Sequence, residues 1–95
     1  MFVEAVVEEE LSVEDGLLLE EAIESLNQKN VDHRLANNMI IFCTSTFGIL
    51  YHHVKIDASA QAPFTIVLTK ANKKICCLPF KECETAMSFI KFLQN

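Results

Sequence analysis

Five short segments of strand-like sequence follow one another between residues 31 and 80, and turn-forming residues separate each from the next. Short connections between consecutive strands are typical of an antiparallel sheet in which neighbours in sequence also pair. We therefore predict a β-meander with strands over residues 31–36, 39–44, 49–56, 64–70 and 74–79. A proline-closed polar loop over residues 57–63 separates the third strand from the fourth.

Segments with helical periodicity flank this run of strands. The first helix is predicted over residues 13–28, where Ser12 is a good N-cap. Leu17 and Leu18 widen its apolar stripe, and Asn30 can end it because asparagine tolerates left-handed backbone. A second helix is predicted over residues 82–93. The apolar stripes consist of Leu19, Ala22, Ile23 and Leu26 in the first helix and Cys83, Ala86, Met87, Ile90 and Leu93 in the second.

The order of these elements predicts the fold class. A chain of 95 residues has the length of one domain, which here covers residues 1–95. We expect an α+β domain: an antiparallel β-meander of about five strands with two helices, one near each end of the chain. The valine-rich residues 2–7 either add an N-terminal strand or extend the first helix.

The lengths of the turns predict how the strands pair. A two-residue turn at Asn37-Asn38 pairs Leu35 with Ile40. A four-residue turn over residues 45–48 would pair Phe42 with Tyr51 and place both on one face. Both faces would then be apolar at their centre, whereas a solvated antiparallel sheet has one polar face. Helices on both sides, a bulge that shifts the register, or a face that meets another protein would each account for this.

Acidic residues are concentrated at the N-terminal end. Residues 1–24 carry a formal charge of −9 and the remaining residues +4, giving −5 for the whole chain. An asymmetric charge distribution of this kind gives information about the partners that a protein binds, and little about its fold. The simpler interpretation is a solvated helix exterior that complements the lysine-rich hairpin of the same fold. The acids are Glu4, Glu8, Glu9, Glu10, Glu14, Asp15, Glu20, Glu21 and Glu24, and the hairpin lysines are Lys70, Lys73, Lys74 and Lys81.

The cysteines and histidines suggest catalytic chemistry only weakly. On the predicted register Cys43 lies diagonally from His52, with Asp32 as the orienting acid, and Cys83 sits at a helix N-terminus, where a thiol pKa can fall. Adjacent strand residues point to opposite faces, so Cys76 and Cys77 cannot easily share a metal, and Cys77 is expected on the core side. The sequence has neither Cys-x-x-Cys nor the histidine spacing of a zinc site, and its two glycines cannot build a glycine-rich phosphate-binding loop. We predict no metal site, no cofactor and no catalytic residues.

No run of apolar residues has the roughly 18 residues of a membrane span, and the N-terminus does not resemble a secretory signal. We therefore expect a cytoplasmic protein with reduced cysteines and no membrane partner. The negative net charge argues against direct nucleic-acid binding, and the hairpin lysines are explained by protection of an edge strand.

These patterns predict a small non-catalytic protein-binding module, a regulator or inhibitor that docks an acidic N-terminal surface on another protein with a basic surface. In size, polarised charge and lack of catalytic motifs the chain resembles small phage or plasmid regulators, anti-restriction and anti-CRISPR proteins among them. That resemblance implies a partner in nucleic-acid-handling or host-defence machinery. A thiol-dependent enzyme or redox sensor using Cys83 or Cys43 and a structural homodimer remain as alternatives. The predicted contact residues are Glu8, Glu9, Glu10, Glu14, Glu20, Glu21, Glu24, Phe42 and Tyr51.

Overall fold

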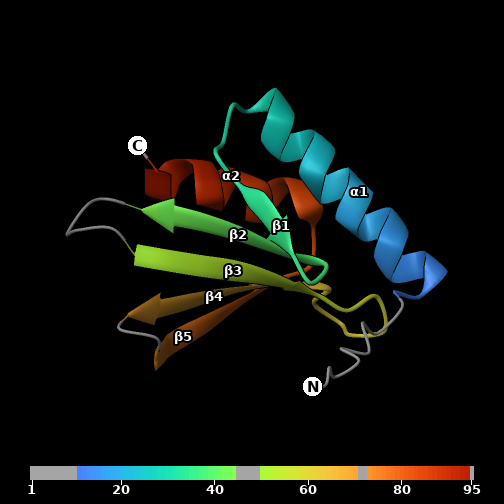
Figure 1. Cartoon of the computed structure of the whole chain (residues 1–95). Coiled ribbons are helices and arrows are strands. Elements are labelled where there is room, and N and C mark those ends of the chain that lie inside the picture. Colours follow the sequence, from blue (N-terminus) through green and yellow to red (C-terminus); the bar gives the residue numbers. More distant parts are fainter. Residues whose placement is uncertain (1–10, 45–49, 71–72, 95) are drawn as a thin grey trace, which may run out of the picture.

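The computed structural model describes residues 11–44, 50–70 and 73–94 and confirms the α+β class (Figure 1). Five antiparallel strands form one sheet in the order β1-β2-β3-β4-β5, with one helix near each end of the chain. The predicted N-terminal strand at residues 2–7 lies outside the described residues. The elements are α1 (Val13–Gln28), β1 (Arg34–Ala36), β2 (Met39–Thr44), β3 (Leu50–Ile56), β4 (Phe64–Lys70), β5 (Lys73–Phe80) and α2 (Cys83–Gln94).

Both helices lie on the same side of the sheet (Figure 1). None of the described helices covers the other face, which is called the uncovered face below. One hydrophobic core therefore forms between the helices and a single sheet face. Burial of this apolar surface is the main force that holds α1 and α2 against the strands. The core residues are Leu19, Ala22 and Leu26 from α1, Ile40, Phe42, Val54, Phe64 and Ile66 from the sheet, Cys83, Ala86, Met87 and Ile90 from α2, and Val31 between α1 and β1.

Both ends of α1 are capped as the sequence predicts. The Ser12 side chain accepts a hydrogen bond from the backbone N–H of Asp15 (3.1 Å). After the helix, Asn30 adopts a left-handed conformation with φ 56°, and the Val31 N–H donates to the carbonyl of Leu26 (3.0 Å). This closing bond is typical of a left-handed C-terminal cap. Because Val31 belongs to the cap, β1 begins only at Arg34, three residues later than predicted.

The β1–β2 hairpin has the predicted register, with Leu35 opposite Ile40 and Ala36 opposite Met39. Its turn residues Asn37 and Asn38 have φ values of 51° and 60°. Two consecutive positive φ values define the hairpin turn whose twist matches that of the strands, and asparagine is among the residues that adopt them most readily.

The predicted register between β2 and β3 is wrong by one residue. Thr44 pairs with Leu50, so Phe42 lies opposite His52 and Cys43 opposite Tyr51. A slip of one residue moves a whole strand's side chains to the other face. In the observed register Val54 and Phe42 are 1% and 2% exposed, in the core under the helices. Tyr51 lies on the opposite face and is 58% exposed.

A bulge between Leu68 and Thr69 shifts the pairing of β4 with β5. Cys77 pairs with Val67 and lies on the uncovered face, where it is exposed, so its predicted place on the core side is wrong. Cys76 lies opposite Leu68 and is half-buried. The one-residue insertion explains the error, because simple alternation from the hairpin turn does not allow for the extra residue.

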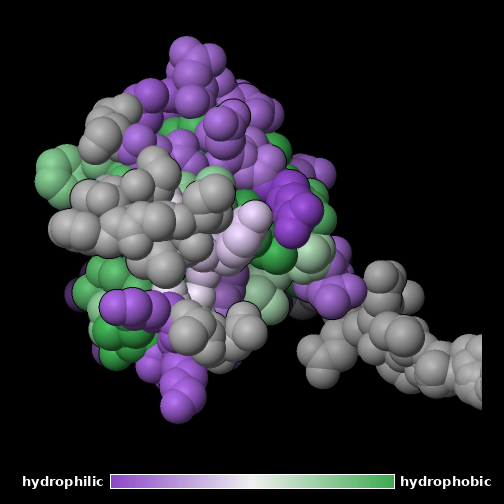
Figure 2. Space-filling view, turned by 60° about the vertical axis from the view of Figure 1, so that its left-hand side comes forward, coloured by the Kyte–Doolittle hydropathy of each residue, from purple (hydrophilic) through white to green (hydrophobic). Residues whose placement is uncertain are grey.

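Strand β5 is one of the two edge strands of the described sheet, and it carries both charged and apolar side chains. Lys73 and Lys74 are exposed at its start, and Ile75 is 59% exposed. Figure 2 shows green hydrophobic surface interleaved with purple hydrophilic surface at the lower left, where the ends of β4 and β5 come forward. Lysines and a bulge on an edge strand hinder pairing with another chain.

Among the described residues, neither helix combines the length and the apolar character that crossing a bilayer requires.

His52 is a buried polar residue that joins three strands. It is 5% exposed, and its Nδ1 accepts a hydrogen bond from the backbone N–H of Thr69 on β4 (3.0 Å). Nε2 therefore carries the proton and donates to Oγ1 of Thr44 on β2 (3.0 Å). Burial, and next the charge of His53, lower the pKa of His52, so the neutral imidazole is the form that the fold accommodates.

We expect stability to fall on mild acidification. The pKa values of His52 and His53 are lowered from 6.5 in the native state, so below pH 6.5 the unfolded chain takes up protons that the native protein resists. The free energy of unfolding then decreases as pH falls, by at most about 1.4 kcal/mol per pH unit for each histidine. Urea denaturation at pH 7 and pH 5 measures this, and His52→Gln should reduce the slope. Equal stability at the two pH values would contradict the prediction.

Candidate functional site

The exposed side of α1 gathers four of the predicted acidic residues. At about 100° per residue, Glu14, Glu20, Glu21 and Glu24 fall within about 120° of the helix circumference. All four are exposed. We call these four residues the acidic ridge. Glu8, Glu9 and Glu10, the other predicted members of the acidic surface, lie outside the described residues.

Two large apolar residues lie within the same arc of α1. Val13 is 74% exposed and Leu17 is 62% exposed. The sequence pattern assigned Leu17 to the buried stripe, but its helical angle is close to those of Glu21 and Glu24, which was the signal that it faces outward. Leu11, just before the helix, is also 36% exposed. The surface around the acidic ridge therefore offers both charge and apolar area.

The acidic ridge is not neutralised by lysines within the described part of the chain. The ion pair found among the described residues joins Lys29, at the end of α1, to Glu84 on α2, and neither residue belongs to the ridge. Lys70, Lys73 and Lys74 belong to the β4–β5 hairpin, which lies at the lower left of Figure 1, whereas α1 lies at the upper right. The ridge and the basic hairpin are thus well separated on the molecule, so the lysines of the hairpin do not neutralise the carboxylates of the ridge.

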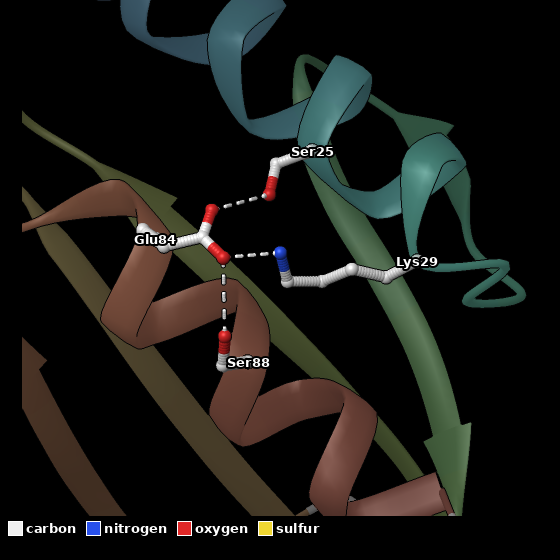
Figure 3. A network of polar contacts seen from close by, with 4 residues as sticks. All are labelled: Ser25, Lys29, Glu84 and Ser88. Carbon is white, nitrogen blue, oxygen red and sulfur yellow. Dashed lines mark hydrogen bonds and ion pairs between the residues drawn. The ribbon is translucent and has the colours of Figure 1, made fainter.

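A polar network fixes α1 on α2 and so holds the ridge in place (Figure 3). The Glu84 carboxylate pairs with Lys29 and accepts hydrogen bonds from the hydroxyls of Ser25 and Ser88, each at 3.4 Å. The hydrogen bond from Lys29, the largest of several favourable contacts, lowers the pKa of Glu84. This carboxylate therefore has partners within the fold, although its side chain is 70% exposed.

The start of α1 is anchored separately. The Asp15 carboxylate accepts a hydrogen bond from the backbone N–H of Ala58, in the loop between β3 and β4 (2.7 Å). Asp15 therefore joins the beginning of the helix to the β3–β4 loop, while Lys29 and Glu84 join its end to α2. Contacts at both ends of α1 thus hold the acidic ridge in one orientation on the domain, and an orientation set before binding reduces the entropy that binding would otherwise lose.

The two aromatic residues predicted for a partner surface lie on opposite faces. Tyr51 is exposed on the uncovered face of the sheet, whereas Phe42 is 2% exposed and packs against the His52 ring (centroids 5.4 Å apart). The suggestion that Phe42 meets a partner is therefore wrong, because its side chain is part of the core. The error follows directly from the one-residue slip between β2 and β3.

Cys43 does not face His52, the base predicted for it. Cys43 and Asp32 line one hollow of ≈ 230 Å³ on the uncovered face together with His33, whose Nδ1 lies 2.9 Å from the carbonyl oxygen of Val31. His52 pairs with Phe42 on the neighbouring strand position, so its ring points to the core face, away from Cys43. In residues 11–44, 50–70 and 73–94 no group of histidine, cysteine and acidic side chains is arranged to hold a metal ion.

Cys83 is unsuited to thiolate chemistry. It is 7% exposed, and burial, followed by the charges of Glu21 and Glu84, raises its pKa to about 11. At pH 8 roughly one molecule in a thousand would then carry the thiolate. In Ellman's assay on the native protein, we expect the exposed Cys77 to react first and Cys83 to react only after denaturant is added. Cys77→Ser should remove the fast phase, and a fast phase that Cys83→Ser removes instead would contradict this.

Comparison with known proteins gives no match: no family model, no curated protein and no solved structure matches this chain.

Proposed function

We propose that this protein is a non-catalytic protein-binding module that regulates or inhibits a partner by docking the acidic ridge of α1 on a basic surface. The observation that carries the proposal is the surface of α1 itself. Four exposed carboxylates surround two exposed apolar side chains, Val13 and Leu17, and no ion pair within the described residues engages the carboxylates.

Charge and apolar area have different roles in such a contact. The carboxylates would attract a basic surface over a distance of about one Debye length, which accelerates encounter and excludes acidic partners. Burial of Leu17 would supply affinity, since covering one leucine side chain contributes about 1.5–3 kcal/mol. A small apolar centre within a charged rim is the usual composition of a protein interface.

A purely solvated helix exterior explains the carboxylates but not the leucine and valine among them. Single exposed apolar residues are common on protein surfaces. Here, however, two of the most exposed large apolar residues of the described chain share an arc with all four ridge carboxylates. The geometry gives the thiol-enzyme alternative less support, because Cys83 is buried and Cys43 and its predicted base His52 lie on opposite faces of the sheet.

Affinity capture from extracts of the source cells tests the proposal. The native protein and two variants of equal net charge serve as bait: Glu20→Gln with Glu24→Gln on the ridge, and Asp32→Asn with Glu82→Gln away from it. We expect a partner that binds the native protein and the second variant but is weakly held by the first, and that is released as salt increases. A partner that binds all three equally would contradict docking through the ridge.

A further inference from the structure

The uncovered face of the sheet is hollowed between β3, β4 and β5. The hollow has a volume of ≈ 500 Å³. Its floor is a cross-strand row in which His53 pairs with Val67 and Val67 with Cys77. Val67 is 3% exposed although neither of the two described helices covers this face, so the floor is deep enough to shield an apolar side chain. Ala60 and Ala62, from the loop after β3, contribute to the wall.

Cationic side chains border this floor. Lys55 precedes the loop at one end of the hollow, and Lys74 lies toward the opposite end, where it pairs with Thr69. With His53 in the central row, three nitrogen-bearing side chains line one hollow. Within the described residues, the side chains of Lys55, Lys74 and His53 make no hydrogen bond and no ion pair. At neutral pH the positive charge comes from Lys55 and Lys74, because the pKa of His53 is lowered, and the carboxylate of Asp57 offsets part of it. The hollow therefore keeps a net positive charge on a protein whose net charge is −5.

The one carboxylate that lines the hollow is engaged elsewhere. Asp57 Oδ1 accepts hydrogen bonds from the N–H and the hydroxyl of Ser59 (3.0 and 2.6 Å), and these bonds are the main reason why the pKa of Asp57 is lowered. Asp57 thus stabilises its own turn, and the charge of Lys55 makes a smaller contribution to its lowered pKa without a direct ion pair within the described residues. The hydroxyl of Thr69 donates to the carbonyl of Tyr51, which leaves the Thr65 hydroxyl as a donor for a ligand.

We infer that this hollow binds a phosphate monoester of a small organic molecule, with the phosphate between Lys55, Lys74 and His53 and the organic part over Val67. A phosphate offers three strongly accepting oxygens and up to two negative charges, which suits two ammonium groups, an imidazole and a hydroxyl better than a carboxylate does. The volume lies in the range of small-molecule sites, and an apolar floor with a few polar groups at its border is typical of them.

This site is independent of the acidic ridge, because α1 lies on the other side of the sheet (Figure 1). Variants of the ridge should leave it unchanged, and failure of one proposal does not affect the other.

His53 provides a reporter for the ligand. Burial, and next the charge of Lys55, lower its pKa. A bound phosphate would add negative charge beside the ring and raise that pKa. The other titratable groups that line the hollow are Lys55, Asp57, Lys74 and Cys77. Replacing Lys55 by glutamine should also raise the pKa of His53, even without ligand, because one positive neighbour is removed.

The test is an NMR titration of the whole chain with phenyl phosphate, inorganic phosphate and phenol as probes. We expect phenyl phosphate to bind in the millimolar range, to shift the signals of His53, Thr65 and Val67, and to raise the pKa of His53. Inorganic phosphate should bind more weakly and phenol should cause no shift. Lys55→Gln with Lys74→Gln should weaken phenyl phosphate binding at least tenfold, whereas the charge-matched control Lys70→Gln with Lys81→Gln should not.

Three results would overturn the inference. The first is no shift of these signals with phenyl phosphate. The second is equal binding by the hollow variant and the control variant. The third concerns phosphate from a nucleic acid: a short single-stranded oligonucleotide that binds more tightly than phenyl phosphate, and that loses affinity in the Lys70 and Lys81 variant, would assign the surface to a nucleic acid instead.

Discussion

Replacing Glu20, Glu21 and Glu24 together by glutamine is expected to slow association with the partner about tenfold or more at low salt. The native protein should lose association rate steeply as salt increases, because the ridge carboxylates act through long-range attraction that ions screen. The variant should show a much flatter dependence. Stopped-flow or surface plasmon resonance across a salt series, with the partner obtained by ridge-dependent capture, measures both effects.

Folding should be almost unaffected by this substitution. The three side chains are exposed, and neighbouring like charges at helical spacing repel one another, so the free energy of unfolding should stay constant or rise slightly. Leu17→Ala is a complementary variant, since removing apolar contact should raise the dissociation rate and leave association nearly unchanged. Association rates that match those of the native protein at every salt concentration would rule out steering by the ridge.

The second large effect concerns the core face of β2. Phe42→Ala is expected to lower the free energy of unfolding by about 3–5 kcal/mol, because it removes a buried aromatic ring and leaves a cavity. For a domain whose total stability is about 5–10 kcal/mol, this loss leaves little margin. Urea denaturation of Phe42→Ala, and of the milder Phe42→Leu if the first variant does not fold, measures the change.

Tyr51→Ala is the matched control, because Tyr51 is the aromatic residue of the adjacent strand on the uncovered face. With 58% of its surface exposed, its loss should change stability by no more than about 1 kcal/mol. The comparison tests the register between β2 and β3 in solution. A larger loss for Tyr51→Ala than for Phe42→Ala would place the tyrosine under the helices, as in the register predicted from turn length.

Much of the candidate site could be read from the chain itself, since helical spacing alone places Glu14, Glu20, Glu21 and Glu24 on one side of the first helix. Three consecutive leucines, Leu17, Leu18 and Leu19, suggest a wide apolar stripe, but the helical angle of Leu17 matches the acidic side of the helix. The structure agrees with the angle: Leu19 is buried against the sheet and α2, and Leu17 is exposed on the opposite side of the helix.

The hollow on the uncovered face could not have been predicted in the same way. Its lining depends on cross-strand pairs between β3, β4 and β5, which bring His53, Val67 and Cys77 into one row. Lys55 and Lys74 are far apart in sequence, and the bulge after Leu68 shifts the pairing partner of Thr69 at the Lys74 end. Local patterns carry no information about such a row unless the register is known.

The sequence by itself determined the order and type of the elements, the caps of α1 and the Asn37-Asn38 turn, because these depend on side-chain periodicity and on backbone preferences within a few residues. Only the tertiary structure decided which sheet face is buried. Strands β2 and β3 carry apolar residues on both faces, so alternation alone does not choose between them. The choice came from the simultaneous packing of Phe42, Val54 and Ile66 against the two helices, which involves residues distant in the chain.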